Sequence, residues 1–129
     1  MQSRRESDFL RRSPLFAEGV SGFTLNRLVQ ASKLKTFDAG SKCEPPEAML
    51  LLIHSGSALL EKPDGSAELL AAGSHVGLGP LGATAHRGSR IRFRERAKTY
   101  ALPLQLAASL PVVRRKLIET YRRRYLDVY

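Results

Sequence analysis

The sequence predicts a single domain of mainly β structure with helices at both ends. Its 129 residues fit one domain, and a hydrophobic share of 43% is enough to build a core without a disulfide or a structural metal. Helical spacing of apolar residues is confined to the two ends, whereas turn residues divide the middle into short runs typical of an antiparallel sheet. We therefore expect a helical segment at residues 8–35, a β-rich core at 36–103 and C-terminal helices at 104–129.

The first long helix is predicted at residues 21–35. Apolar side chains recur there at helical spacing, and Ser21 or Thr24 can cap the N-terminus. Upstream, residues 8–12 predict a short helical turn that ends before Pro14, because the residue preceding a proline disfavours helical backbone.

About eight short strands are predicted in the middle of the chain. The clearest hairpin joins residues 57–62 to 66–70, because Asp64 and Gly65 supply the chemistry of a tight turn. Residues 77–88 hold four glycines and one proline, too many for a regular strand or a long helix. We predict a loop there whose backbone passes close to a ligand.

Two basic segments follow the Gly-rich loop. Residues 90–100 alternate in character, and a single strand would place five cations on one face: Arg90, Arg92, Arg94, Arg96 and Lys98. Residues 112–129 predict a helix with several arginines opposite an apolar stripe, and Tyr121, Tyr125 and Tyr129 share one face of it. These rings either pack the helix onto the β core or form a homodimer contact.

The net charge of +9 favours an anionic partner or ligand. The cationic strand face invites a nucleic-acid reading, but no aromatic residue is interleaved on that face, since Phe93 has the opposite parity. Residues 112–129 also leave too little chain for a DNA-reading helix-turn-helix. A solvated face, or one that binds an acidic protein, is the favoured interpretation.

Several function classes lack support in the sequence. Cys43 is the only cysteine, which excludes an intramolecular disulfide and a Cys-rich zinc site, and the start of the chain has no secretory pattern, so we expect a cytoplasmic protein. The longest apolar run, 48–53, is far below the roughly 20 residues of a membrane span. His54, His75 and His86 lack metal-ligand spacing, and no catalytic constellation is present, so we expect neither an enzyme nor a required cofactor.

The order of these features resembles the cyclic nucleotide-binding domain shared by catabolite activator-type regulators, kinase regulatory subunits and nucleotide-gated channels. The similar segments are residues 9–40, the strand and Ser-Gly turn at 50–56, and residues 70–77. The resemblance covers nearly the whole chain. It implies a double-stranded β-helix, a β-roll of jelly-roll type closed by N-terminal and C-terminal helices, with a phosphate-binding cassette at residues 77–89.

The residue types of that loop suit a cyclic phosphate. A Gly-rich turn can aim backbone N–H groups at the anion, and an arginine adds bidentate, charge-assisted hydrogen bonds. By resemblance, Arg87 takes the place of the family's arginine, followed by the small residues Gly88 and Ser89. The candidate ligand-binding residues are Gly77, Leu78, Gly79, Leu81, Arg87, Gly88 and Ser89.

Leu78 is the most informative departure from the family pattern. The family has a glutamate there that accepts a hydrogen bond from the ribose 2′-hydroxyl, a contact worth about 1.5–3 kcal/mol that leucine cannot make. Three readings stay open: a cyclic mononucleotide (cAMP or cGMP) held by the remaining contacts, a cyclic dinucleotide or other anion, and a roll that has lost its ligand.

We expect a non-catalytic regulatory module that binds a cyclic nucleotide and relays binding through its C-terminal helix. The alternative is a degenerate β-roll that binds an acidic protein through its basic strand face or its last helix.

Overall fold

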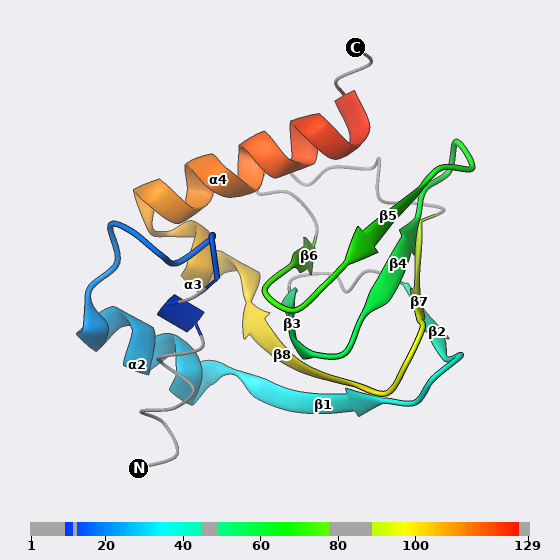
Figure 1. Cartoon of the computed structure of the whole chain (residues 1–129). Coiled ribbons are helices and arrows are strands. Elements are labelled where there is room, and N and C mark those ends of the chain that lie inside the picture. The colour runs from blue at the N-terminus through cyan, green and yellow to red at the C-terminus, as the bar shows by residue number, and fades with distance from the viewer. Residues whose placement is uncertain (1–9, 12, 45–48, 78–88, 127–129) are drawn as a thin grey trace.

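The structure is a computed structural model that describes residues 10–11, 13–44, 49–77 and 89–126. Within these residues the chain forms, in order, α2 (Gly22–Ala31), β1 (Lys33–Phe37), β2 (Lys42–Cys43), β3 (Met49–Ser55), β4 (Ala58–Glu61), β5 (Ala67–Leu70), β6 (His75–Gly77), β7 (Arg90–Phe93), β8 (Ala97–Pro103), α3 (Leu104–Ala108), α4 (Pro111–Tyr121) and the π-helical turn η2 (Arg122–Leu126). The predicted mainly β domain with flanking helices is confirmed (Figure 1).

The strands form two four-stranded antiparallel sheets. One sheet has the order β1-β8-β3-β6 and the other has the order β2-β7-β4-β5. The chain passes repeatedly from one sheet to the other, and β6 and β5 are edge strands of the two sheets. In Figure 1 the C-terminal helix α4 crosses above β6 and β5, where those edges approach each other. The cleft lined by β5, β6 and the last helical turns lies at this crossing.

The core has two parts, and β3 separates them. Leu50 and Leu52 pack into the cluster formed with the helices, while Leu51 and Ile53 pack into the cluster inside the roll. All four are at most 3% exposed. Alternate side chains of a strand point to opposite faces, so a strand covered on both faces reads as an unbroken apolar run. Burial on both sides therefore explains the run that begins at Met49.

The helix predicted at 21–35 ends earlier, at Ala31. Its N-cap is Ser21, whose Oγ accepts a hydrogen bond from the Thr24 N–H at 3.1 Å, as predicted. Ser32 adopts extended backbone, and Lys33 already pairs with Ala101 of β8. Leu34, inside the predicted helix, lies in β1 and is 55% exposed. The strand register with β8 overrides the helical spacing of this last turn.

The prediction of one basic strand at 90–98 is wrong. β7 ends at Phe93 in one sheet, and β8 begins at Ala97 in the other. The intervening turn is fixed by the Arg94 N–H, which donates to the Ser57 carbonyl at 3.1 Å. Phe93 and Ala97 both point into the roll interior, so inward-facing and outward-facing side chains keep the same parity on both sides of the turn. The five cations are all exposed, but they lie on two sheets and a turn rather than on one face.

The C-terminal helices pack into the core cluster that also contains the buried side chains of α2. Pro111 occupies the first turn of α4, where its missing N–H costs no hydrogen bond, and α4 buries Val113 and Leu117. Tyr121, the last residue of α4, is half-buried, and the π-helical turn continues the helix from Arg122. The predicted positions of the Tyr125 and Tyr129 side chains lie outside the described residues. No helix in the described part of the chain is long and apolar enough to cross a membrane.

Candidate functional site

Most of the predicted ligand loop, residues 78–88, lies outside the described residues. The candidate residues that fall there are Leu78, Gly79, Leu81, Arg87 and Gly88. The structure does describe both ends of the loop, Gly77 and Ser89.

The two ends of the loop belong to different sheets. Gly77 closes β6 and pairs with Leu50 of β3. A Cβ on Gly77 would lie 2.9 Å from the Met49 carbonyl oxygen, so a larger side chain does not fit without a backbone shift. Ser89, at 2% exposure, is buried directly before β7 of the other sheet. The segment 78–88 therefore connects the edge strand of one sheet to an inner strand of the other.

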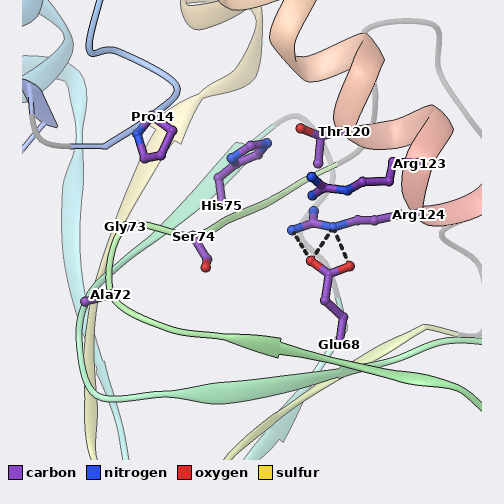
Figure 2. Close-up of a pocket in the computed structure, with 9 residues that line it drawn as sticks. All are labelled: Pro14, Glu68, Ala72, Gly73, Ser74, His75, Thr120, Arg123 and Arg124. Carbon is purple, nitrogen blue, oxygen red and sulfur yellow. Dashed lines mark hydrogen bonds and ion pairs between the residues drawn. The ribbon is translucent and has the colours of Figure 1, made fainter.

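A cleft of about 260 Å³ lies beside the first end of this loop, between the β5–β6 turn and the C-terminal helix. Figure 2 shows its lining, which comes from the N-terminal segment, β5, the turn, β6 and the last helical turns: Pro14, Glu68, Ala72, Gly73, Ser74, His75, Thr120, Arg123 and Arg124. None of these residues was a predicted site residue.

The N-terminal segment closes one side of the cleft. The Ser13 hydroxyl donates to the Gly73 carbonyl at 3.2 Å, and the Lys116 ammonium of α4 donates to the Pro14 carbonyl at 2.7 Å. Ser13 is fully buried at 0% exposure. These two hydrogen bonds tie the turn, the N-terminal segment and α4 together, so they define the cleft walls.

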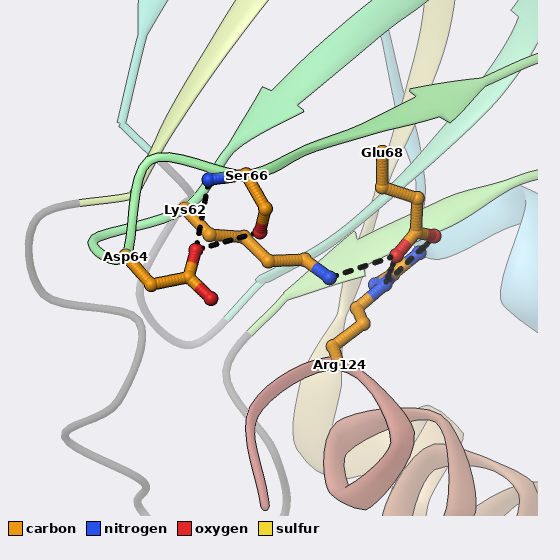
Figure 3. A network of polar contacts seen from close by, with 5 residues as sticks. All are labelled: Lys62, Asp64, Ser66, Glu68 and Arg124. Carbon is orange, nitrogen blue, oxygen red and sulfur yellow. Dashed lines mark hydrogen bonds and ion pairs between the residues drawn. The ribbon is translucent and has the colours of Figure 1, made fainter. Parts of the chain in front are cut away.

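An ion pair links the last helical turn to β5. The Arg124 Nε donates to both Glu68 carboxylate oxygens at 3.2 and 3.1 Å, and a terminal nitrogen of the same guanidinium lies 3.1 Å from Oε2. The Arg124 side chain is only 5% exposed, and Lys62 lies 3.6 Å from the same carboxylate. Charge-assisted contacts of a guanidinium with both carboxylate oxygens are among the stronger polar contacts in proteins. This contact holds the helix against the roll (Figure 3).

The hairpin that carries Glu68 turns where the sequence predicts it. The Asp64 Oδ1 accepts hydrogen bonds from the Ser66 N–H at 2.9 Å and the Ser66 hydroxyl at 2.6 Å, as Figure 3 shows. These bonds hold the pKa of Asp64 below its ordinary value. Gly65 has φ +88°, which favours glycine. The turn fixes the β4–β5 register, in which Glu68 pairs with Leu60.

His75 faces this cleft as a neutral imidazole. Burial, helped by the positive charges of Arg124 and Arg123, lowers the pKa of His75 to about 3. Its Nε2 atom is buried and has no hydrogen-bond partner among the described residues. Arg123 is exposed, and no acidic side chain in the described part of the chain pairs with it. The sequence gives no sign of this environment, because the spacing of His75 from the other histidines does not suit a metal site.

The lone cysteine lies elsewhere. Cys43 of β2 is half-buried at the margin of the roll interior, and burial raises the pKa of its thiol, although Lys35 acts in the opposite direction. A thiol with a raised pKa stays protonated and weakly nucleophilic near neutral pH. The described residues contain no cluster of three His, Cys, Asp or Glu side chains that could hold a metal ion.

One signal in the sequence pointed toward the cleft. Glu68 has the same strand parity as the buried Leu70, which places a carboxylate on the inner side of β5. The arginine-rich last helix supplies its partner. No local pattern indicated which arginine reaches Glu68, because the two residues are 56 positions apart in the chain.

No protein-family model matches the chain, and no curated protein matches it. Solved structures do match. The regulatory domain of Toxoplasma gondii PKA with cAMP aligns with a TM-score of 0.75 at 16% identity, over 95% of this chain and 50% of that chain. The regulatory subunit of a cAMP-independent protein kinase A from Trypanosoma brucei aligns with a TM-score of 0.71 at 18% identity, over 95% and 49%.

A putative cyclic nucleotide-binding protein from Geobacter metallireducens aligns with a TM-score of 0.70 at 20% identity, over 94% of this chain and 98% of that chain. The chain thus spans about half the length of the two regulatory chains of protein kinase A and nearly all of the bacterial one. The architecture of two sheets closed by helices is that of a cyclic nucleotide-binding domain, and this chain has that fold.

Proposed function

We propose that the protein is a non-catalytic sensor module that binds a phosphate-bearing cyclic nucleotide through residues 77–89 and relays binding through its C-terminal helix. The observation that carries the proposal is the position of the two ends of this segment. Gly77 closes β6 in one sheet of a cyclic nucleotide-binding fold, two residues after the cleft residue His75, and Ser89 directly precedes β7 in the other sheet.

Arg87 is the proposed phosphate ligand. A guanidinium can make two parallel hydrogen bonds to phosphate oxygens, and backbone N–H groups of the glycines can add more. Gly77 itself is required by the fold, because a Cβ there would lie 2.9 Å from the Met49 carbonyl oxygen of β3. Gly88 and Ser89 complete the proposed contact at the start of β7.

The ligand class follows from Leu78. Without an acceptor for the ribose 2′-hydroxyl, cAMP or cGMP depends on the phosphate contacts, and a cyclic dinucleotide meets less negative charge than in a site with glutamate. The matching structures include one named with cAMP and one named as cAMP-independent, so the fold itself does not fix the nucleotide. We propose one of these cyclic nucleotides as the ligand.

The C-terminal helix is the proposed relay. It is held to β5 by Arg124 and Glu68, and to the N-terminal segment by Lys116 and Pro14. A ligand bound by residues 77–89 would lie near this helix, because β6, which leads into that segment, lines the cleft under the helix. Binding that favours one position of the helix shifts its population and exposes or covers a partner surface. A homodimer through this helix is one such surface.

A second candidate function is supported by the outer face of the sheet that contains β7. Lys42 of β2 pairs directly with Arg92 of β7, Arg90 is also exposed there, and Leu69 of β5 is 52% exposed. Cations beside an exposed apolar side chain suit an acidic protein partner with some apolar surface. On this alternative the roll binds no nucleotide and acts as an interaction domain.

Thermal shift and calorimetry on the whole chain test the proposal, with cAMP, cGMP, cyclic di-GMP and cyclic di-AMP as ligands. At about 1 mM ligand, a Kd of about 10 µM predicts about 2.7 kcal/mol of stabilisation, which is several degrees in Tm. Arg87→Ala should remove the response, whereas Arg96→Ala, at an exposed turn arginine, should retain it. No response to any of the four nucleotides would exclude the sensor proposal and leave the interaction domain.

A further inference from the structure

The cleft between β6 and the last helical turns is not explained by the proposed nucleotide loop. Val76 packs into the roll interior, so the neighbouring His75 points to the opposite face of β6. That face is covered by the end of α4 and the π-helical turn, not by the roll interior. His75 therefore reaches the cleft from outside the roll, whereas Glu68 reaches it from the inner side of β5.

The cleft carries a surplus of positive charge. Arg124 and Lys62 already neutralise Glu68, the one carboxylate among the residues that line it. Arg123 has no acidic partner in the described part of the chain, and Glu119, one helical turn earlier, forms no ion pair with it there. An anion in this cleft would therefore meet the positive charge of Arg123, which no carboxylate of the described lining already balances.

Two hydrogen-bonding groups in the cleft also have no partner among the described residues. Burying a polar atom without a hydrogen bond costs free energy, yet the His75 Nε2 atom is buried in this condition. The Thr120 hydroxyl has no hydrogen-bond partner among the described residues either. Figure 2 shows the Arg123 and Thr120 side chains extending from the helix toward His75, whereas Arg124 is turned to Glu68. His75, Thr120 and Arg123 therefore face the same cleft.

We propose that this cleft binds a small oxyanion, the phosphate or carboxylate group of a ligand, between the guanidinium of Arg123, the Nε2–H of His75 and the hydroxyl of Thr120. The volume of about 260 Å³ is sufficient for a group of that size. An oxyanion there joins β6 to the helix end and strengthens the contact that Arg124 makes with β5.

The local backbone and the protonation state support the same assignment. Arg123 lies in a π-helical turn, and such widened turns are frequent at functional sites. Because His75 stays neutral near pH 7, it acts as a hydrogen-bond donor through its Nε2 tautomer, and Arg123 supplies the charge. This site goes beyond the nucleotide proposal and does not require Arg87.

Nuclear magnetic resonance of the histidine side chains tests the site directly, because the chain has only three histidines. Inorganic phosphate and acetate are titrated separately at pH 7 and constant ionic strength, and the imidazole signals of His75 are followed. We expect saturable shifts for phosphate, for acetate, or for both; the stronger of the two identifies the ligand group. Arg123→Gln should weaken the binding by at least about tenfold, because a charge-assisted contact is lost.

The matched control is Arg122→Gln, an exposed arginine on the same turn that lines a different surface groove. It should bind as the native chain does. Equal loss in the two variants would show general charge screening, and no saturable shift with either anion up to about 20 mM would show that no site exists; either result overturns the proposal. Arg87→Ala separates the two proposals: the anion response at His75 should persist in it whether or not nucleotides bind, and loss of that response would also overturn the second site.

Discussion

His75 is a histidine that the native fold keeps uncharged. An exposed histidine titrates near 6.5, whereas burial and two arginines lower the pKa of His75 to about 3 in the folded chain. Between these values the unfolded chain holds a proton that the native chain excludes. Stability is therefore fully present above about pH 6.5 and falls as the pH drops toward 3.

The pH dependence of unfolding should show this effect. Below about pH 6.5, His75 should cost up to about 1.4 kcal/mol of stability per pH unit, and His75→Phe should remove that part of the slope. Tm is measured from pH 8 to pH 4 for both proteins. Above about pH 7.5 their difference should be constant, since neither state is protonated there. An identical slope for the two proteins below pH 6.5 would show that the native chain does not exclude the proton.

Gly56 is constrained by a contact as well as by its backbone angle. It has φ +87°, and a Cβ there would lie 2.5 Å from the Arg96 carbonyl oxygen and 2.8 Å from the Ala97 Cα. Gly65 has nearly the same φ, +88°, but open space around the Cβ position. This pair separates backbone strain from steric overlap.

Alanine at each position should therefore have different costs. Gly65→Ala should lose about 1–2 kcal/mol from the left-handed backbone alone, and Gly56→Ala should lose about 1–3 kcal/mol more because the backbone atoms of the β7–β8 turn must move. Chemical denaturation of both variants gives the two values. Equal losses would mean that the turn at 94–96 yields easily and does not hold Gly56 in place.

At the level of elements, the C-terminal helix is attached by an ion pair whose arginine is nearly buried. Arg124→Gln should destabilise the chain by about 1.5–3 kcal/mol and reduce hydrogen-exchange protection in the last helical turns first, because the contact crosses from η2 to β5. Glu61→Gln is the control, since Glu61 and Arg92 are 39% and 45% exposed and 3.6 Å apart.

The exposed pair should contribute no more than about 1 kcal/mol. Denaturation curves and native-state hydrogen exchange check both variants. If Arg124→Gln left the protection of the last helical turns unchanged, the Arg124–Glu68 contact would not be what docks the helix.

The elements also show where sequence reasoning succeeds and where it fails. The hairpin at Asp64 and Gly65 was predictable because its turn is held by local hydrogen bonds to Ser66. The break between β7 and β8 was not, because Phe93 and Ala97 keep the same inward parity across the bend. Alternation of polar and apolar residues predicts which face of a sheet each side chain occupies. The pattern is the same whether the residues form one long strand or two short ones.

The two candidate sites also differ in how far the sequence predicts them. The glycines, the arginine and the departure at Leu78 are local features of residues 77–89, so the loop could be predicted, and it stays a prediction. The cleft was missed because Glu68, His75 and Arg123 come from three distant parts of the chain. Only the order of strands in the two sheets, with β5 and β6 at adjoining edges under the helix, brings them together.

For the whole molecule, the effect of the net charge of +9 depends on where the cations lie. The described part of the chain has three ion pairs, two of which share Glu68, while both sheets and the last helix carry exposed arginines and lysines. Repulsion among exposed like charges destabilises the compact state and is screened by salt, whereas a nearly buried pair such as Arg124–Glu68 is screened much less.

Added salt should therefore stabilise this protein. Raising NaCl from about 20 to 300 mM shortens the Debye length from roughly 20 Å to about 6 Å, which screens the long-range repulsion while leaving the contact at Glu68 in place, so Tm should rise by several degrees. The double variant Arg90→Glu, Arg94→Glu lowers the net charge by four and should flatten the dependence. A Tm that falls with salt would mean that attractive ion pairs outweigh repulsion across the molecule, and the exposed cations would then have to be paired with acidic groups more closely than the described residues show.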